Sequence, residues 1–410
     1  MLHDPVRHEP LRDIAWSAAR ARAAIAWIVA DTEARFVPGA GWPPHPKDLD
    51  SGDDPRQPAT PLYHGAAGVV WALRYLQDAG ATPRASRWHD ELEPLRQRNR
   101  TWLAGAGSDA FGSYLMGDTP IRLMQHADEP TAAHADELAG LLEGNLARPE
   151  RELMWGSPGT LLAASFLHHR SGDERWADLY RRAAARLWSE LRWSDAHGCH
   201  YWQQDLYGRS SSYLDAVHGF VATAHGLIRG RHLLEPGDWP AWQAAIVQTV
   251  SRSATREDGM ASWRCQLFEP DFASGKKLMQ FCHGAPGFVI CLAGLPAGTE
   301  LDALLLEAGE ATWAAGPLAK GSNLCHGTAG NGYAFLKLYE RSGDERWLQR
   351  ARAFAMHAIA QAEADAHQYG QLRYSLWTGD PGIAIYLWDC LREQAAFPTL
   401  DVFDATVARA

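Results

Sequence analysis

The sequence has little cysteine, no excess of positive charge and no long hydrophobic run. Six cysteines in 410 residues are too few for a disulfide framework, and we expect a reducing, cytoplasmic environment. The formal net charge of -10 argues against nucleic acid as a partner, because binding it requires a basic surface. The longest strongly apolar run near the N-terminus, Ala23 to Ala30, is far shorter than the roughly 20 residues of a membrane helix. The first residues lack an apolar signal core, so we expect neither a secretory signal nor a membrane segment.

A repeated unit accounts for much of the chain. The hexapeptide Ser-Gly-Asp-Glu-Arg-Trp occurs at residues 171–176 and again at 342–347, an offset of 171 residues. The preceding residues keep the same register, because Gly156-Ser-Pro-Gly159 aligns with Gly327-Thr-Ala-Gly330. In both copies a Gly-x-x-Gly stretch, which we call a glycine turn, precedes an apolar helical segment, and a charged amphipathic segment follows the hexapeptide. The repeating unit is therefore a glycine turn, a buried helix, a short turn and an amphipathic helix.

The glycine turn occurs seven times, twice in degenerate form, at intervals of about 40 to 65 residues. Glycine lets the chain turn tightly before each helix begins. The segment after each turn is mostly apolar and the segment before it is charged along one side. This pattern predicts buried inner helices and water-facing outer helices. The turns begin at Gly65, Gly117, Gly156, Gly219, Gly284, Gly327 and Gly379.

Seven such helix pairs predict an all-α fold, an α/α toroid with a double ring of about seven inner and seven outer helices. One ring would use the whole chain, so we expect residues 1–410 to form a single domain. The turns would gather at one end of the ring, and the residue before each first glycine would point to a common centre. Those residues are His64, Met116, Trp155, His218, His283, His326 and Thr378.

Three stretches interrupt the helical pattern. Residues 37–61 are rich in proline, glycine and aspartate, which predicts a surface loop. Residues 195–213 and 256–281 lack helical periodicity, and each precedes a glycine turn. We therefore expect both of these stretches to form lips over the central cleft.

Two Cys-His-Gly triplets, at residues 282–284 and 325–327, open the fifth and sixth glycine turns. Cysteine and histidine are common ligands of zinc. The aligned turn at Gly156 has Met-Trp in place of Cys-His, so the repeat itself does not demand these residues. The alternative is that each cysteine is a small buried hydrophobic residue. A catalytic zinc takes three protein ligands, and the residues alone leave four candidates open. These candidates are Cys282, His283, Cys325 and His326.

Other turns carry candidates for acid–base catalysis. His218 precedes Gly219, and an inward-facing imidazole there can transfer protons near pH 7. His64 has the equivalent position at the first turn. The alternative for both is a hydrogen-bonded core histidine. Asp118 follows Gly117 and is a further catalytic candidate, although capping the next helix is its expected role.

These motifs resemble the lanthionine synthetase C family, and specifically its stand-alone LanC-like members. The seven recurrent elements of that family match, in order, YHGAAGVVWAL, SYLMGDTP, MWGSPG, AVHGF, FCHGAPG, LCHGTAGNGYAFLKLY and SLWTGDPG, over about residues 60–390. The resemblance implies one zinc ion held by Cys282, Cys325 and His326, with an open fourth position. It also implies that His283 belongs to the cleft wall, where it would contact the substrate.

The resemblance implies further roles. His218 corresponds to the active-site histidine of the family, a general acid or base. Lys320 matches a lysine that serves glutathione in eukaryotic members, and Arg373 lies in the segment of their arginine, a few residues out of register. The peptide cyclases of the family use an aspartate shortly before the second glycine turn, whereas residues 112–117 contain no acid here and Asp118 lies on the other side of the glycine. This departure disfavours the cyclase mechanism.

The resemblance implies a zinc-dependent enzyme that adds a thiol to dehydroalanine or dehydrobutyrine residues of a dehydrated peptide or protein. Glutathione is the first choice of thiol. One alternative is a lanthipeptide cyclase, which would need a separate dehydratase partner. Another is a non-catalytic adaptor that binds zinc and a thiol, or a kinase. A sugar hydrolase on the same toroid is a fourth reading, but it needs paired carboxylates in the cleft, and the turns offer histidine and cysteine instead.

Overall fold

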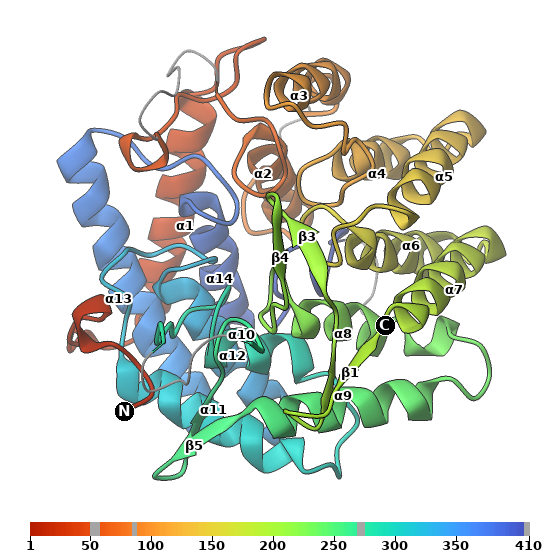
Figure 1. Cartoon of the computed structure of the whole chain (residues 1–410). Helices are drawn as coiled ribbons and strands as arrows, with labels where there is room; N and C mark the ends of the chain where they lie inside the picture. Colours follow the sequence, from red (N-terminus) through yellow and green to blue (C-terminus); the bar gives the residue numbers. More distant parts are fainter. Residues whose placement is uncertain (50–57, 84–87, 269–274, 406–410) are drawn as a thin grey trace.

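The structure is a computed structural model that describes residues 1–49, 58–83, 88–268 and 275–405. Figure 1 shows two layers of helices around a common centre. Each inner helix begins just after the first glycine of its turn, and most of its residues are buried. The inner helices are α2 (Ala66–Asp78), α4 (Thr119–Asp128), α6 (Ser157–Ser171), α8 (Phe220–Arg229), α10 (Ala285–Leu292), α12 (Thr328–Ser342) and α14 (Asp380–Arg392).

The outer layer consists of longer amphipathic helices. In the second copy of the repeat, α12 packs against the outer helix α13, and in the first copy α6 packs against α7. Short 3-10 helices lie at Pro5–Arg7, Pro46–Asp48 and Arg231–Leu233. The outer helices are α1 (Ala18–Ala34), α3 (Leu92–Gly105), α5 (Ala132–Leu146), α7 (Glu174–Ser189), α9 (Trp239–Ser253), α11 (Leu301–Ala315) and α13 (Glu345–Tyr369).

The inner helices form a closed ring. Each contacts the next in chain order, and α14 contacts α2 to close the circle. The predicted fold class, an all-α α/α toroid with seven inner and seven outer helices, is therefore confirmed for the part of the chain that the structure describes. In that part, no helix is long and apolar enough to cross a membrane.

The repeated hexapeptide ends one helix and begins the next. Gly343 terminates α12 in the left-handed conformation, with a φ of 68°, which glycine adopts without steric cost. The carboxylate of Asp344 then accepts a hydrogen bond from the amide of Arg346 at 2.9 Å and caps α13. Trp347 is fully buried under the turn. The first copy, at 171–176, has the same arrangement.

The glycine turns lie at one end of the ring because their backbones are hydrogen-bonded to one another. The amide of Cys282 donates to the carbonyl of Cys325 (3.0 Å), the amide of Cys325 to Trp377 (2.8 Å), that of Trp377 to Tyr63 (3.1 Å), and that of Tyr63 to Leu115 (3.1 Å). Similar bonds join the second turn to the third and the third to the fourth. All seven inner helices therefore direct the positive ends of their dipoles to the same end of the ring, which favours anions there.

The C-terminal residues fill the centre of the ring. The indole of Trp71 on α2 donates to the carbonyl of Phe403 at 2.9 Å, and Lys337 on α12 pairs with Asp401 at 2.9 Å. The ring of Phe397 stacks on Phe281 with a centroid distance of 4.5 Å. Because these partners come from different sides of the ring, the C-terminal segment packs inside the ring.

The lips predicted at 195–213 and 256–281 include short antiparallel hairpins. The side-chain amide of Gln204 donates to the carbonyl of His218 at 2.6 Å, and Trp155 donates to the hydroxyl of Tyr207 at 3.0 Å, so the second hairpin touches two turns. Figure 1 shows it across the middle of the ring. The pairs are β1 (Arg192–Ser194) with β2 (Cys199–Tyr201), β3 (Gln204–Leu206) with β4 (Arg209–Ser211), and β5 (Thr255–Glu257) with β6 (Met260–Ser262).

Parts of two predicted stretches lie outside the described residues. These are 269–274 of the second lip and 50–57 of the loop predicted at 37–61. In the described part of that loop, Trp42 and His45 are buried.

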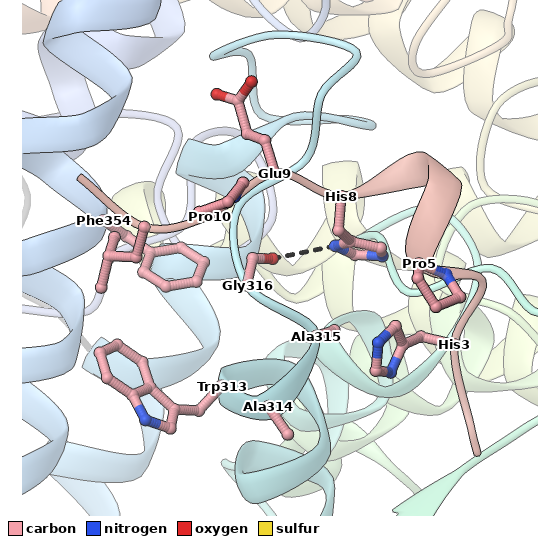
Figure 2. A pocket seen from close by; sticks show the side chains of 11 residues that line it. His3, Pro5, His8, Glu9, Pro10, Trp313, Ala314, Ala315, Gly316 and Phe354 are labelled. Atoms are coloured by element: carbon pink, nitrogen blue, oxygen red, sulfur yellow. Dashed lines mark hydrogen bonds between the residues drawn. The ribbon is translucent and has the colours of Figure 1, made fainter.

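The N-terminal segment packs against the outer layer beside the sixth turn. The amide of Glu9 donates to the carbonyl of Pro317, and the amide of Ala319 donates to Arg7, both at 3.0 Å. Figure 2 shows the cavity of about 530 Å³ between this segment, the end of α11 and Phe354 of α13. These bonds fix the stretch that leads from α11 to the second Cys-His-Gly triplet.

Candidate metal centre

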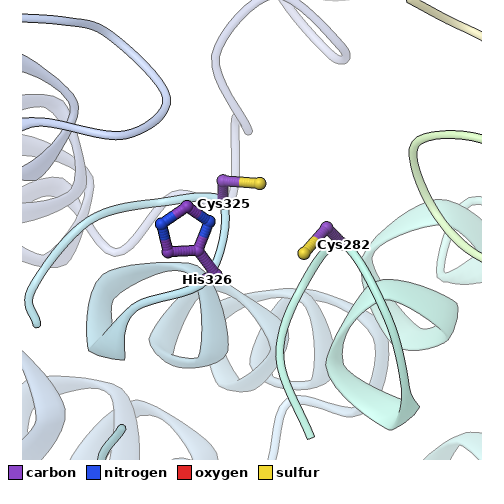
Figure 3. A group of neighbouring side chains, drawn as sticks. All are labelled: Cys282, Cys325 and His326. Carbon is purple, nitrogen blue, oxygen red and sulfur yellow. The ribbon is translucent and has the colours of Figure 1, made fainter. Parts of the chain in front are cut away.

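Cys282, Cys325 and His326 come together at the turn end of the ring. One ligand atom from each lies within 4.8 Å of the other two. Figure 3 shows the three side chains around one common space. The hydrogen bond from Cys282 to the carbonyl of Cys325 joins the two turns and so sets this geometry. His283 does not belong to this group. Its role in the cleft wall, which the resemblance implies, stays a prediction.

The donor set fits zinc. Two cysteine sulfurs and one imidazole are soft and borderline ligands of the kind zinc prefers. The sulfurs are shielded from water, since Cys282 is 7% and Cys325 1% exposed. Among the described residues, Nε2 of His326 is buried and has no hydrogen-bond partner. Three protein ligands leave one position of a tetrahedral ion for another ligand.

A second layer of side chains, which sequence reasoning missed, holds the two sulfurs. The hydroxyl of Tyr63 lies 2.8 Å from Sγ of Cys325, and the side-chain amide of Gln280 donates to Sγ of Cys282 at 2.9 Å. Hydrogen bonds of this kind orient metal ligands and stabilise thiolates. Both residues lie in the turns themselves, Gln280 just before the first triplet, but only the closed ring brings Tyr63 to Cys325.

The two cysteines differ in their electrostatic surroundings. Burial raises the pKa of Cys282 far above its ordinary value, and the neighbouring Cys325 adds to this effect. Burial also opposes ionisation of Cys325, but hydrogen bonds with Cys282 and Tyr63 and the charges of Lys320 and Arg373 outweigh it, so the pKa of Cys325 is lowered. Cys325 is therefore the cysteine that ionises more readily.

His218 is paired with a buried acid. Its Nδ1 lies 2.8 Å from Oε2 of Glu152, a side chain with no exposed surface. Burial alone would lower the pKa of His218, but the hydrogen bond and charge of Glu152, together with the charge of Asp215, raise it above its ordinary value. Because Glu152 occupies Nδ1, the other ring nitrogen remains available for proton transfer.

His283, like His218, is paired with a buried acid. Its Nδ1 lies 2.7 Å from Oδ2 of the fully buried Asp215, close enough for an ion pair, although the angle is poor for a hydrogen bond. Burial lowers the pKa of His283, and the charge of Asp215 more than reverses this effect. The rings of His218 and His283 lie 6.5 Å apart, with Tyr213 beside both. The ion pair of Asp215 and His283 joins the fourth turn to the fifth. The described residues show no backbone hydrogen bond between these two turns.

Glu152 and Asp215 were missed as candidates, although a signal exists. Each stands four residues before the first glycine of its turn, and each accepts hydrogen bonds from the backbone of that turn. Each carboxylate also pairs with the histidine of the following turn: Glu152 with His218, and Asp215 with His283. The register of the repeat could have identified them.

The remaining catalytic candidates lie apart from this cluster. Burial lowers the pKa of His64 to about 4, so its ring is neutral, and it packs against Trp102 of α3 at 5.5 Å. Asp118 is fully buried and bonds Arg100 and Asn99 on α3. Its side chain makes no capping bond to α4, so the expected capping hydrogen bond is not observed. In the described part of the chain, none of these bonds reaches the metal ligands.

Lys320 and Arg373 line one small cavity. His45, Asp365 and Asp380 line it as well. The charges of both cations act on Cys325, so the cavity adjoins the candidate metal centre. The structure thus brings together the two residues that the resemblance connects with a thiol substrate, including Arg373, whose register in the sequence differs from the family pattern.

The Cys-Cys-His group at the turn end of this α/α toroid could hold a metal ion. A family model described as lanthionine synthetase C-like protein matches residues 58–402. The chain therefore belongs to the lanthionine synthetase C-like family.

Similar proteins agree with this assignment. The chain is 27% identical over 371 residues to Glutathione S-transferase LANCL1 of Danio rerio, which covers 83% of this chain and 84% of that protein. It is 39% identical over 119 residues to LanC-like protein GCL1 of Arabidopsis thaliana, or 27% of each chain. The solved structure of nisin cyclase matches with a TM-score of 0.57 at 14% identity and covers 91% of this chain and 99% of that one, which shows a shared fold.

Proposed function

We propose that this protein is an enzyme that adds a small thiol to dehydroalanine or dehydrobutyrine residues of a dehydrated peptide or protein. Glutathione is the leading thiol, which the name of the Danio rerio relative supports. The observation that carries the proposal is the group of Cys282, Cys325 and His326 within 4.8 Å, on the same end of the ring as the pair formed by His218 and Glu152.

The three ligands would hold one zinc ion. When bound, zinc lowers the pKa of a thiol and so maintains it as a nucleophilic thiolate near neutral pH. Tyr63 and Gln280 orient the two cysteine sulfurs through their hydrogen bonds. The buried positions of both cysteines exclude water from the sulfurs, which preserves the electrostatic effect of every neighbouring charge.

The reaction needs a proton donor, and we assign this role to His218. As the thiolate forms a bond to the β-carbon, the electrons of the carbon–carbon double bond move to the α-carbon and give an enolate. His218 then protonates the α-carbon, while Glu152 holds its Nδ1 and stabilises the charged ring. The thiol loses one proton and the product gains one, so the addition needs no oxidant or reductant.

The thiol itself needs an anchor beside the metal centre. Lys320 and Arg373 carry the positive charges of the adjoining cavity and would bind carboxylates of a glutathione-like thiol. His283, held by Asp215, lies beside His218 and would contact the peptide.

A mass measurement tests the proposal. The zinc-loaded protein is incubated with glutathione and a dehydroalanine peptide that contains no cysteine. We expect the peptide to gain the mass of one glutathione with the wild-type protein and not with Cys325→Ala. A peptide that carries its own cysteine serves as the comparison. Reaction of that peptide alone, with loss of its free thiol and no gain in mass, would replace the proposal by cyclisation.

A further inference from the structure

The guanidinium of Arg373 already has an internal carboxylate as its partner. Its Nε lies 2.9 Å from both carboxylate oxygens of Asp48, and its Nη2 contacts the same group. The two side chains are only 15% and 28% exposed. Bonds between a guanidinium and a carboxylate in such a shielded place are among the stronger hydrogen bonds in proteins. Asp48 therefore already occupies the Nε and Nη2 side of the guanidinium, one of the two faces on which arginine binds a carboxylate.

Asp48 is held in this place by its neighbours. It ends the 3-10 helix Pro46–Asp48, whose N-terminus is capped by His45, where Nδ1 accepts a hydrogen bond from the amide of Lys47 at 3.1 Å. His45 is 2% exposed and packs edge-on against Tyr369 at 4.7 Å. Lys47 pairs with Asp365 at 2.5 Å. The segment is thus fixed to the end of α13, and Asp48 faces Arg373 as part of a built structure.

The charges of the cavity leave one cation uncommitted. Arg373 is paired with Asp48, and Asp365 is paired with Lys47. Asp380 accepts a hydrogen bond from the amide of Arg373 at 2.7 Å, and burial raises the pKa of Asp380 to about 7. Lys320 is exposed and lines the same cavity, and the described residues offer it no ion pair. Within the described residues, a ligand therefore meets one cation without an ion-pair partner, Lys320, and one, Arg373, that Asp48 neutralises.

We propose that Asp48 determines which thiol the site selects, because its carboxylate competes with a carboxylate of the thiol for Arg373. This inference rests on the proposed function. A thiol with two carboxylates, such as glutathione, meets the competing carboxylate of Asp48 when it binds both Lys320 and Arg373. A thiol without carboxylates leaves the pair between Asp48 and Arg373 in place. Asp48 therefore weakens the preference of the site for dicarboxylate thiols.

Calorimetric titration tests this competition through binding alone. The two ligands are glutathione and its diethyl ester, which has the same skeleton and no carboxylate. Asp48→Asn keeps the shape of the side chain and removes its charge. We expect Asp48→Asn to bind glutathione about tenfold more tightly than the wild type, since hydrogen bonds to charged groups contribute energies of this order. The Kd of the diester is expected to stay unchanged.

Two further variants separate competition from other effects. Glu363→Gln removes the same charge from α13, where Glu363 pairs with Arg20 on the surface, and it is expected to bind both ligands like the wild type. In Arg373→Gln the additional change Asp48→Asn is expected to give no gain, because the competed donor is absent. Asp48→Ala is expected to bind glutathione as tightly as Asp48→Asn does. It serves as a second test in case Asp48→Asn does not fold.

The outcomes distinguish this inference from the proposed function. An unchanged Kd for glutathione in Asp48→Asn, or an equal gain for the diester, overturns the role of Asp48 even if the peptide adduct forms. Absence of the adduct with tighter binding of glutathione in Asp48→Asn overturns the proposed reaction and supports the competition. Absence of glutathione binding in every variant contradicts both.

Discussion

Cys282 and Cys325 occupy equivalent places in neighbouring turns, yet their chemistry differs because different neighbours reach them. Gln280 donates to Cys282, whereas Tyr63 and the nearby cations act on Cys325. The same holds for the histidines, since Glu152 holds His218 and Asp215 holds His283. At the scale of single residues, the chemistry of each cysteine and histidine depends on which side chains the neighbouring turn of the ring brings to it.

The pH dependence of the reaction tests the role of Glu152. As a proton donor, His218 must be protonated, so activity falls as pH rises through its pKa. Glu152 raises this pKa against the effect of burial. Glu152→Gln removes the charge, so we expect the alkaline limb of kcat/KM to move to lower pH. The measurement is a pH–rate profile with glutathione and a dehydroalanine peptide.

Two comparisons accompany this profile. Glu150→Gln changes an acid that pairs with Arg148 beside the same turn and is expected to keep the wild-type profile. His218→Asn is expected to lower kcat by roughly a hundredfold, the usual scale for loss of a general acid. An alkaline limb that stays in place in Glu150→Gln and Glu152→Gln alike would show that Glu152 does not act through His218.

Part of the site could be predicted from residues alone. Two Cys-His-Gly triplets in register predicted a metal site among four candidate ligands, and the resemblance selected Cys282, Cys325 and His326. The structure places these three together. Glu152 could have been found from the register of the repeat. The roles of Tyr63 and Asp48 could not be predicted, because each acts on a side chain from a distant part of the chain.

At the scale of elements, the repeat predicted the helices well. Both copies of the hexapeptide end one helix with a left-handed glycine and begin the next with an aspartate cap. In the turns that contain it, the second glycine has a different purpose. A methyl group at Gly330 would overlap the carbonyl oxygen of Leu324, and one at Gly287 would overlap that of Phe281. These glycines allow the inner helices to lie against their own turns.

Substitution of Gly330 tests this explanation. Gly330→Ala is expected to lower the free energy of unfolding by about 2 kcal/mol or more, because the backbone must move to relieve the overlap. Gly140 in α5 is the matched control, since nothing lies within 4 Å of an added methyl group there. Gly140→Ala is expected to stabilise the protein by roughly 0.5 to 1 kcal/mol. Denaturant titration measures both changes, and equal effects would refute the packing argument.

At the scale of the whole molecule, the ring closes through bonds between turns that are remote in sequence. The amide of Trp377 donates to Tyr63, and this bond links the last turn to the first. Seven repeats predicted such a ring. They did not predict that the C-terminal segment would fill its centre, because residues 393–405 carry no repeated motif. The contacts of Phe397, Asp401 and Phe403 reveal the position of this segment.

The ring also brings the candidate metal ligands to this end. Seven inner helices direct their positive ends there, which favours the thiolate forms of the cysteines, and the fifth and sixth turns, joined by a backbone bond, supply all three candidate ligands. The central claim is therefore that Cys282, Cys325 and His326 hold one zinc ion in the folded protein.

Metal analysis of purified variants tests this claim most directly. The matched control is Cys291→Ala, which removes a buried cysteine on α10 that does not belong to the group. We expect about one zinc per chain in the wild type and in Cys291→Ala, and loss of zinc in Cys282→Ala and Cys325→Ala, since removal of one of three ligands opens the site. Full zinc content in Cys325→Ala, or a folded wild-type protein that takes up no zinc, would contradict the account.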